Sequence, residues 1–119
     1  MNTASRGQEG ERLAARYVLQ KGYKVLEQNY RRRRGEIDLI AKDGETLVFL
    51  EVKTWHTYGT DQIFYSIDRR KQQRIISIAR MYLREHPEYE GTPVRFDVIF
   101  VEGESGRIEH YPYAFEEEG

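Results

Sequence analysis

Two stretches of sequence decide the fold of this chain: Gly35-Glu-Ile-Asp-Leu-Ile-Ala41 and Leu47-Val-Phe-Leu-Glu-Val-Lys53. Each is typical of a buried β-strand, yet Asp38 stands inside the first, and Glu51 and Lys53 stand inside the second. Removing a charged side chain from water costs on the order of several kcal/mol unless a counter-charge or a metal compensates it. The three charges therefore predict a functional site on the sheet.

The composition predicts one domain over residues 1–119 with a single modest core, since 39% of the residues are hydrophobic. The 19 Lys and Arg residues nearly balance the 20 Asp and Glu residues, so a local basic patch must bind any acidic partner. The absence of cysteine excludes disulfides, thiolate metal ligands and a cysteine nucleophile.

The N-terminus lacks the apolar core of a signal sequence. No apolar run approaches the roughly 20 residues that a bilayer-spanning helix needs. We therefore expect a soluble, cytoplasmic protein without membrane contact.

The apolar pattern predicts an α/β domain: a mixed sheet of four or five strands, a helix before it, and a long helix inserted after the third strand. Apolar residues recur at helical spacing in two segments, while β-branched and aromatic residues mark the strands. The expected elements are a helix at 10–22, strands at 23–30, 36–41 and 46–52, a loop at 56–65, a helix from Ser66 or Asp68 to His86, and strands at 94–101 and 107–111.

The hairpin loop decides whether the charges meet, because side chains alternate between the two faces of a strand. A two-residue turn at Asp43-Gly44 sets Asp38 opposite Phe49. Glu51 is then the diagonal neighbour of Asp38 on the facing strand. A four-residue loop would instead set Asp38 directly opposite Glu51. An odd loop or an uncompensated bulge would send Asp38 to the other face.

Two carboxylates that meet on one face can hold a divalent cation. The oxygens of Asp38 and Glu51, the Val52 carbonyl and waters match the octahedral shell that Mg²⁺ or Mn²⁺ prefers. This arrangement suits phosphodiester hydrolysis, in which Lys53 positions the attacking water or neutralises developing charge. The alternative is a structural ion pair between Lys53 and a carboxylate.

A run of four arginines, Arg31, Arg32, Arg33 and Arg34, directly precedes the first charged strand. We predict that this run forms a basic loop that binds nucleic-acid phosphates without reading sequence. Lys71, near the start of the second predicted helix, adds a further contact. The alternatives are a solvated loop and an ordinary charged helix surface.

The histidines give no sign of a metal site, since His56, His86 and His110 lack the spacing of ligands. We expect each of them at the surface. Asp97 breaks the apolar pattern of its strand, and a partner from the basic helix or loop would explain it.

The motif 35–41, followed by Val48-Phe-Leu-Glu-Val-Lys-Thr54, resembles the signature of the YraN family of small bacterial proteins. Through that family the chain resembles the PD-(D/E)XK nuclease-like superfamily, near the archaeal Holliday junction resolvases. The resemblance implies a restriction-endonuclease-like fold in a single nuclease-like domain. It spans nearly the whole chain and includes Gly10-Glu11, Ala14, Gly22-Tyr23, Lys71, Ala79, Tyr82-Leu83 and Arg95-Phe-Asp-Val98.

The resemblance also implies roles for individual residues. Asp38, Glu51 and Lys53 fall on the metal-binding and catalytic positions of the superfamily. Glu11 falls where related resolvases have a first-helix carboxylate near the metal. The implied function is an Mg- or Mn-dependent endonuclease acting on DNA, including branched or structured DNA, for which a homodimer would supply two sites. The alternatives are a non-catalytic nucleic-acid-binding module of the same fold and a protein-interaction domain.

Overall fold

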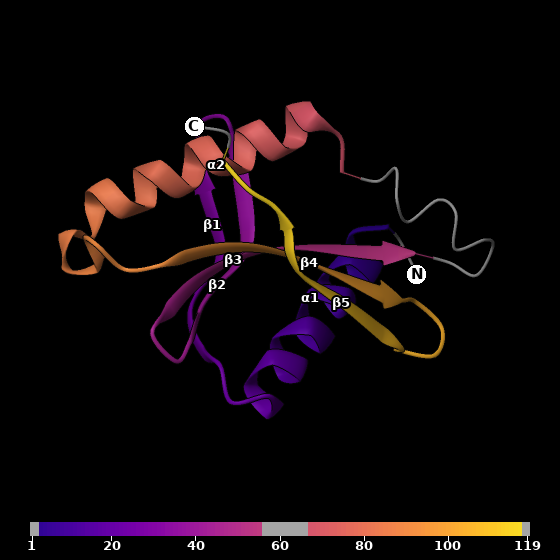
Figure 1. The fold of residues 1–119 in the computed structure, drawn as a ribbon. Helices are drawn as coiled ribbons and strands as arrows, with labels where there is room; N and C mark the ends of the chain where they lie inside the picture. The colour runs from indigo at the N-terminus through magenta and orange to yellow at the C-terminus, as the bar shows by residue number, and fades with distance from the viewer. Residues whose placement is uncertain (1–2, 56–66, 118–119) are drawn as a thin grey trace.

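The computed structural model describes residues 3–55 and 67–117. The predicted loop at 56–65, which includes His56, and the Ser66 alternative for the helix start lie outside the described residues. Two helices lie on opposite sides of one sheet (Figure 1). The elements are α1 Thr3–Gln20, β1 Lys24–Arg32, β2 Gly35–Asp43, β3 Thr46–Trp55, α2 Arg69–Glu85, a short 3₁₀ helix η2 Pro87–Tyr89, β4 Val94–Glu102 and β5 Ile108–Phe115.

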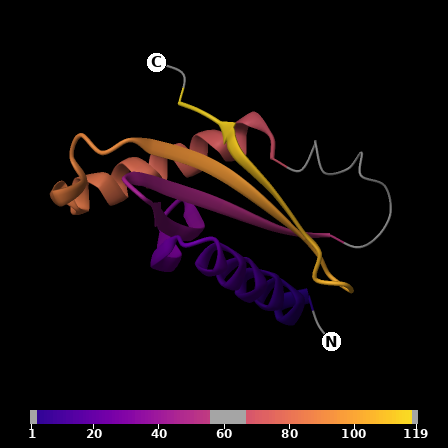
Figure 2. The same ribbon diagram turned by 60° about the horizontal axis from the view of Figure 1, so that its bottom comes forward.

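The sheet has five strands in the order β1-β2-β3-β4-β5. β3 and β4 are parallel, and the other neighbouring strands are antiparallel. The chain between the two parallel strands contains α2, because parallel neighbours need a long crossover. The predicted mixed sheet is confirmed, and the arrangement matches a restriction-endonuclease-like fold (Figures 1 and 2).

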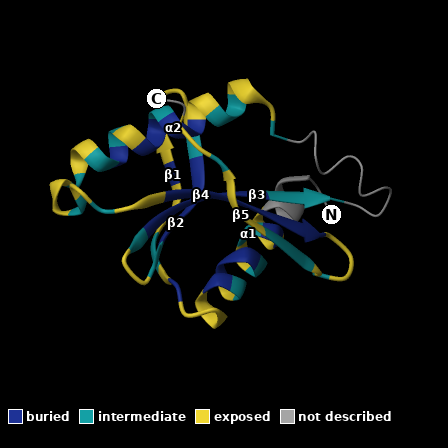
Figure 3. Cartoon of the chain, in the orientation of Figure 1, coloured by how far each residue is buried: buried dark blue, intermediate teal, exposed yellow. Residues whose placement is uncertain are grey.

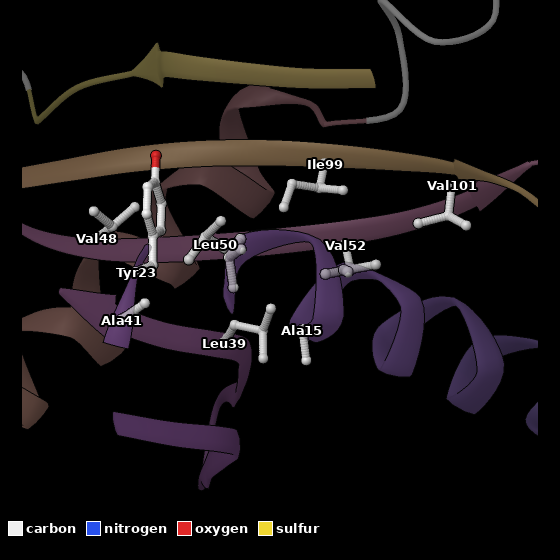
Figure 4. Packing of buried hydrophobic residues seen from close by; sticks show 11 residues of the cluster. Ala15, Tyr23, Leu39, Ala41, Val48, Leu50, Val52, Ile99 and Val101 are labelled. Carbon is white, nitrogen blue, oxygen red and sulfur yellow. The ribbon is translucent and has the colours of Figure 1, made fainter. Parts of the chain in front are cut away.

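α1 covers one face of the sheet and forms a core with it. The side chains of β2, β3 and β4 that point toward α1 are aliphatic and almost fully buried (Figure 4). The buried members of this core are Ala14, Ala15, Val18, Tyr23, Leu39, Ala41, Val48, Leu50, Val52, Ile99 and Val101.

α2 covers the opposite face, and its buried side faces the sheet (Figure 3). Asp68 caps the start of this helix, as predicted, and His86 ends it before Pro87. No described helix combines the length and the apolar character needed to cross a membrane. The buried members of this second core are Tyr30, Ile37, Ile40, Leu47, Phe49, Ile75, Ile76, Ile78, Ala79, Tyr82 and Phe96.

The β2–β3 hairpin has a two-residue loop, but it lies one residue later than predicted. Asp43 pairs with Thr46, so Gly44 and Glu45 form the loop. Gly44 adopts a φ of 59°, which glycine takes without the steric penalty of a side chain. The shift changes the register: extending the ladder sets Asp38 opposite position 51 instead of position 49.

The basic run is only partly a loop. Arg31 and Arg32 belong to β1, where Arg32 pairs with Gly35, and Arg33 and Arg34 alone form the turn. The prediction of a four-arginine loop is therefore wrong, because the β1–β2 ladder continues to the end of both strands.

A buried polar network lies on the α1 side of β4. Asp97 accepts hydrogen bonds from Arg95 Nε, at 2.9 Å, and from His110 Nε2, at 2.7 Å. Tyr17 Oη lies 3.1 Å from His110 Nδ1. The predicted surface position of His110 is wrong, since only 3% of its side chain is exposed. The partners of Asp97 come from β4 and β5, not from the basic helix or loop.

Gly10 brings α1 close to β3. It lies inside α1, which begins earlier than predicted, and a Cβ atom at this position would lie 2.1 Å from Thr54 Oγ1. Such a distance is far below van der Waals contact, so a larger residue fits here only if the Thr54 side chain moves. The close approach also sets the position of the next residue, Glu11.

We predict that Gly10→Ala destabilises the protein by about 1 to 3 kcal/mol, the usual range for overpacking. In an open helix the same change would stabilise by up to about 1 kcal/mol. In a Thr54→Ala background the clash is absent, so Gly10→Ala should then be neutral or stabilising. Urea unfolding of the four proteins measures this, and an equal effect in both backgrounds would contradict the contact.

Candidate metal centre

The site lies where β2 and β3 separate. Their last ladder pair is Leu39 with Leu50, and beyond it β3 continues beside β4 alone. Asp38 Oδ2 accepts a hydrogen bond of 2.7 Å from the Val52 backbone N–H. At this fork, where β3 leaves β2, a side-chain carboxylate thus replaces the backbone carbonyl as the acceptor for the Val52 N–H. It is held in place with only 6% of the residue exposed.

Asp38 and Glu51 line the same pocket, on the face of the sheet that α2 covers. The pocket has a volume of about 270 Å³. Its walls combine acidic residues from the sheet, basic residues from α2 and the β1–β2 turn, and two isoleucines of α2. The lining residues are Arg34, Gly35, Glu36, Asp38, Glu51, Val52, Lys71, Arg74, Ile75 and Ile78.

Three carboxylates meet beside this pocket. Glu11, Glu36 and Asp38 each offer one oxygen, and these oxygens lie within 4.8 Å of one another. Glu11 reaches the group from α1 and accepts a hydrogen bond of 2.8 Å from Asn29 Nδ2. The triad can hold a metal ion, because hard divalent cations prefer clustered carboxylate oxygens.

Sequence reasoning did not assign Glu36 to the site. The available signal was its spacing: Glu36 lies two residues before Asp38 and shares its face of β2. It also accepts a hydrogen bond of 2.8 Å from Arg31 Nε.

Glu51 is not a member of this triad, and two lysines compensate its charge. Its Oε1 lies 2.9 Å from Lys71 Nζ and 4.0 Å from Lys53 Nζ. The residue is buried, with 5% exposed. The closer ammonium group therefore comes from α2 and not from β3, where the sequence placed the catalytic lysine.

The acidic groups disfavour one another's charge. Burial raises the pKa of Asp38 to about 8, with the Glu51 charge adding to the shift and the Val52 N–H opposing it. Burial and the neighbouring Lys71 lower the pKa of Lys53. Burial would also lower the pKa of Lys71, but its contact with Glu51 outweighs this effect and raises it. A divalent cation would relieve the repulsion among the carboxylates.

The four predicted arginines divide into two pairs. Arg31 is bound to Glu36, and Arg32 forms an ion pair of 2.6 Å with Glu85. Within residues 3–55 and 67–117, Arg33 and Arg34 have no ion pair, and Arg34 lines the pocket. Arg33 and Arg34 thus remain available to an external anion.

Arg74 also lines the pocket, and sequence reasoning did not single it out as a site residue. Its position three residues after Lys71 was the signal, since residues three apart share a helix face.

The chain matches the family described as "Uncharacterised protein family UPF0102" over residues 10–101. The chain belongs to the UPF0102 family. UPF0102 is the family that the sequence motifs indicated under the name YraN. The match includes every acidic and lysine side chain of the site described above.

UPF0102 proteins of similar length occur in distant bacteria. One from Geobacter metallireducens is 41% identical over 120 residues, covering 98% of this chain and 96% of the relative. One from Clostridioides difficile is 40% identical, covering 97% of this chain and 100% of the relative. One from Treponema pallidum is 39% identical, covering 93% and 92%. None of these protein names states an activity.

The raised pKa of Asp38 predicts how stability depends on pH. The folded protein keeps this proton up to about pH 8, whereas the unfolded chain releases it near the ordinary value of 3.8. Stability therefore falls as the pH rises through this window. Asp38→Asn has no such proton to release. Its stability relative to wild type should increase by about 2 to 3 kcal/mol between pH 5 and pH 7, at about 1.4 kcal/mol per unit.

Urea unfolding in EDTA at both pH values measures this difference. Asparagine keeps an oxygen that can accept the Val52 N–H bond, so the comparison isolates the ionisation of Asp38. A difference that stays constant with pH would contradict the raised pKa.

Proposed function

We propose that this protein is a metal-dependent nuclease of the PD-(D/E)XK superfamily, related to the archaeal Holliday junction resolvases. It hydrolyses phosphodiester bonds in DNA, including branched or structured DNA. The observation that carries the proposal is the buried Asp38 carboxylate, held at the strand fork in one pocket with Glu51 and close to Glu11 and Glu36.

The donor set fits Mg²⁺ or Mn²⁺. Every acidic donor is a hard oxygen, and Cys is absent from the chain. Asp38, Glu11 and Glu36 would hold the ion, and Glu51 and the Val52 carbonyl are the further ligands that the sequence predicts. A bound divalent ion would polarise the phosphoryl oxygen and lower the pKa of its water.

The chain's own residues would divide the remaining work. Lys53 Nζ orients the attacking water or donates a hydrogen bond to the phosphate, and its lowered pKa makes proton exchange at Nζ easier than in an ordinary lysine. Arg34 and Arg74 bind phosphate oxygens at the pocket wall. Ile75 and Ile78 form an apolar part of the wall that limits access of bulk water.

Residues 1–119 act as one nuclease-like domain in this proposal. A homodimer would present two pockets to a symmetric DNA junction, and a DNA substrate implies action in the cytoplasm. Arg33 and Arg34 at the β1–β2 turn bind the DNA backbone beside the pocket.

We predict that the purified protein with Mn²⁺ cleaves at least one of branched, single-stranded and duplex DNA. Asp38→Asn and Lys53→Met should reduce the rate by at least about 100-fold, the scale of losing one electrostatic or acid–base group. Arg107→Gln, an exposed position at the end of the β4–β5 turn, should cleave like wild type.

Two other outcomes identify the alternative functions. Salt-sensitive DNA binding by all variants with cleavage by none would indicate a non-catalytic nucleic-acid-binding module. Absence of both Mn²⁺ stabilisation and DNA binding would indicate a protein-interaction domain with a structural ion pair at Glu51.

A separate prediction concerns the arginines. Arg33→Gln/Arg34→Gln should reduce the slope of log affinity for duplex DNA against log salt by about 2, because each lost phosphate contact contributes about 0.9. Arg31→Gln/Arg32→Gln removes the same amount of charge from the adjoining end of β1, but these guanidinium groups already pair with Glu36 and Glu85. Its effect on the slope should be smaller, and equal slopes for the two double variants would contradict this assignment.

A further inference from the structure

Lys71 holds the carboxylate that the sequence assigned to the metal. Its Nζ lies 2.9 Å from Glu51 Oε1, whereas Lys53 Nζ lies 4.0 Å away. Glu51 is buried, and about a third of each lysine side chain is exposed. One buried carboxylate thus has two ammonium groups beside it, and the tighter contact comes from the lysine that lies outside the strand motif.

The first turn of α2 carries Lys71 at an electrostatically unfavourable position. This turn has no acidic residue, and Arg69 and Arg70 precede Lys71. The positive end of a helix dipole disfavours cations in the first turn. Asp68 nevertheless fixes this turn by accepting a hydrogen bond of 2.9 Å from the Lys71 backbone N–H. The contact with Glu51 therefore offsets the unfavourable electrostatic position of the Lys71 ammonium group.

We infer that Lys71 is a displaceable counter-cation, which occupies Glu51 in the metal-free protein and moves from it to the substrate phosphate when a divalent ion binds. This inference rests on the metal site of the proposed function. Two ammonium groups and a divalent cation repel one another strongly within a few ångströms in a partly buried pocket. One ammonium group must leave, and the longer contact of Lys53 shows that Lys71 is the one that competes directly for the Glu51 oxygen.

Lys71 has a place to move to. It lines the pocket together with Arg34 and Arg74, and its ammonium group sits on a flexible four-carbon stem. A phosphate in the pocket would receive the ammonium group that the metal has displaced. Lys71 thus acts as a positioning residue that couples metal binding to phosphate binding, and such coupling is reciprocal between the two ligands.

The test is a calorimetric titration of Mn²⁺ into wild type, Lys71→Met, Lys71→Arg and Lys53→Met, without DNA. Lys71→Met removes the competing charge and should bind Mn²⁺ about tenfold more tightly than wild type. Lys71→Arg keeps the charge and should bind like wild type. Lys53→Met removes the more distant charge and should gain less than about threefold.

A second readout follows DNA binding with Ca²⁺ in place of Mn²⁺. The gain in DNA affinity on adding Ca²⁺ should be larger for wild type than for Lys71→Met. If Lys71→Met does not fold, Lys71→Gln repeats both measurements, because it can still donate a hydrogen bond to Glu51 without carrying a charge.

The titrations distinguish a failure of the Lys71 role from a failure of the proposed metal site. Equal or weaker Mn²⁺ affinity in the neutral Lys71 variants, with wild type binding Mn²⁺, would overturn the role of Lys71 and leave the proposed nuclease untouched. No Mn²⁺ binding by any of the proteins would overturn the proposed metal site and this inference together.

Discussion

The hydrogen bond from the Val52 N–H to the Asp38 carboxylate is the interaction on which the site depends. It forms where the β2–β3 ladder ends after Leu39 and Leu50, while β3 continues beside β4. A fork in a sheet leaves backbone donors without ladder partners, and a buried unpaired N–H is costly. The Asp38 side chain removes that cost, and the geometry that satisfies the backbone also places a carboxylate in the lining of the pocket.

Two buried aspartates show how this site differs from a structural network. Asp97 is fully buried, and burial alone would raise its pKa. Hydrogen bonds from His110 and Arg95 outweigh that effect and hold its pKa below the usual value. Asp38 accepts only a backbone N–H among its named partners, and acidic neighbours raise its pKa further. The charge of Asp97 is therefore compensated by side chains of the protein itself. The carboxylate group of Asp38 and its acidic neighbours is stabilised only when a cation binds to it.

Sequence periodicity was sufficient for the type and order of the main elements and for the shared face of Asp38 and Glu51, but not for the bounds of the elements. It placed the hairpin loop one residue early, because Asp-Gly marks a turn without showing whether Asp43 remains in the strand. It overlooked Glu36. This residue can take part in a metal site together with Asp38 and Glu11, and Glu11 belongs to α1 on the other side of the sheet. It also treated the four arginines as equivalent, although Arg32 meets Glu85 of α2 only in the folded chain.

The sequence by itself determined that an α/β domain with a mixed sheet would carry acidic residues and a lysine inside two core strands. Strand alternation and apolar patterning are local properties, so residue order alone reveals them. Only the tertiary structure decided which charges compensate one another. Ion pairs and carboxylate clusters depend on distances between elements that are far apart in sequence, and those distances follow from how α1 and α2 pack against the sheet. The contact of Lys71 with Glu51, and the meeting of Glu11 with Asp38, exist for that reason.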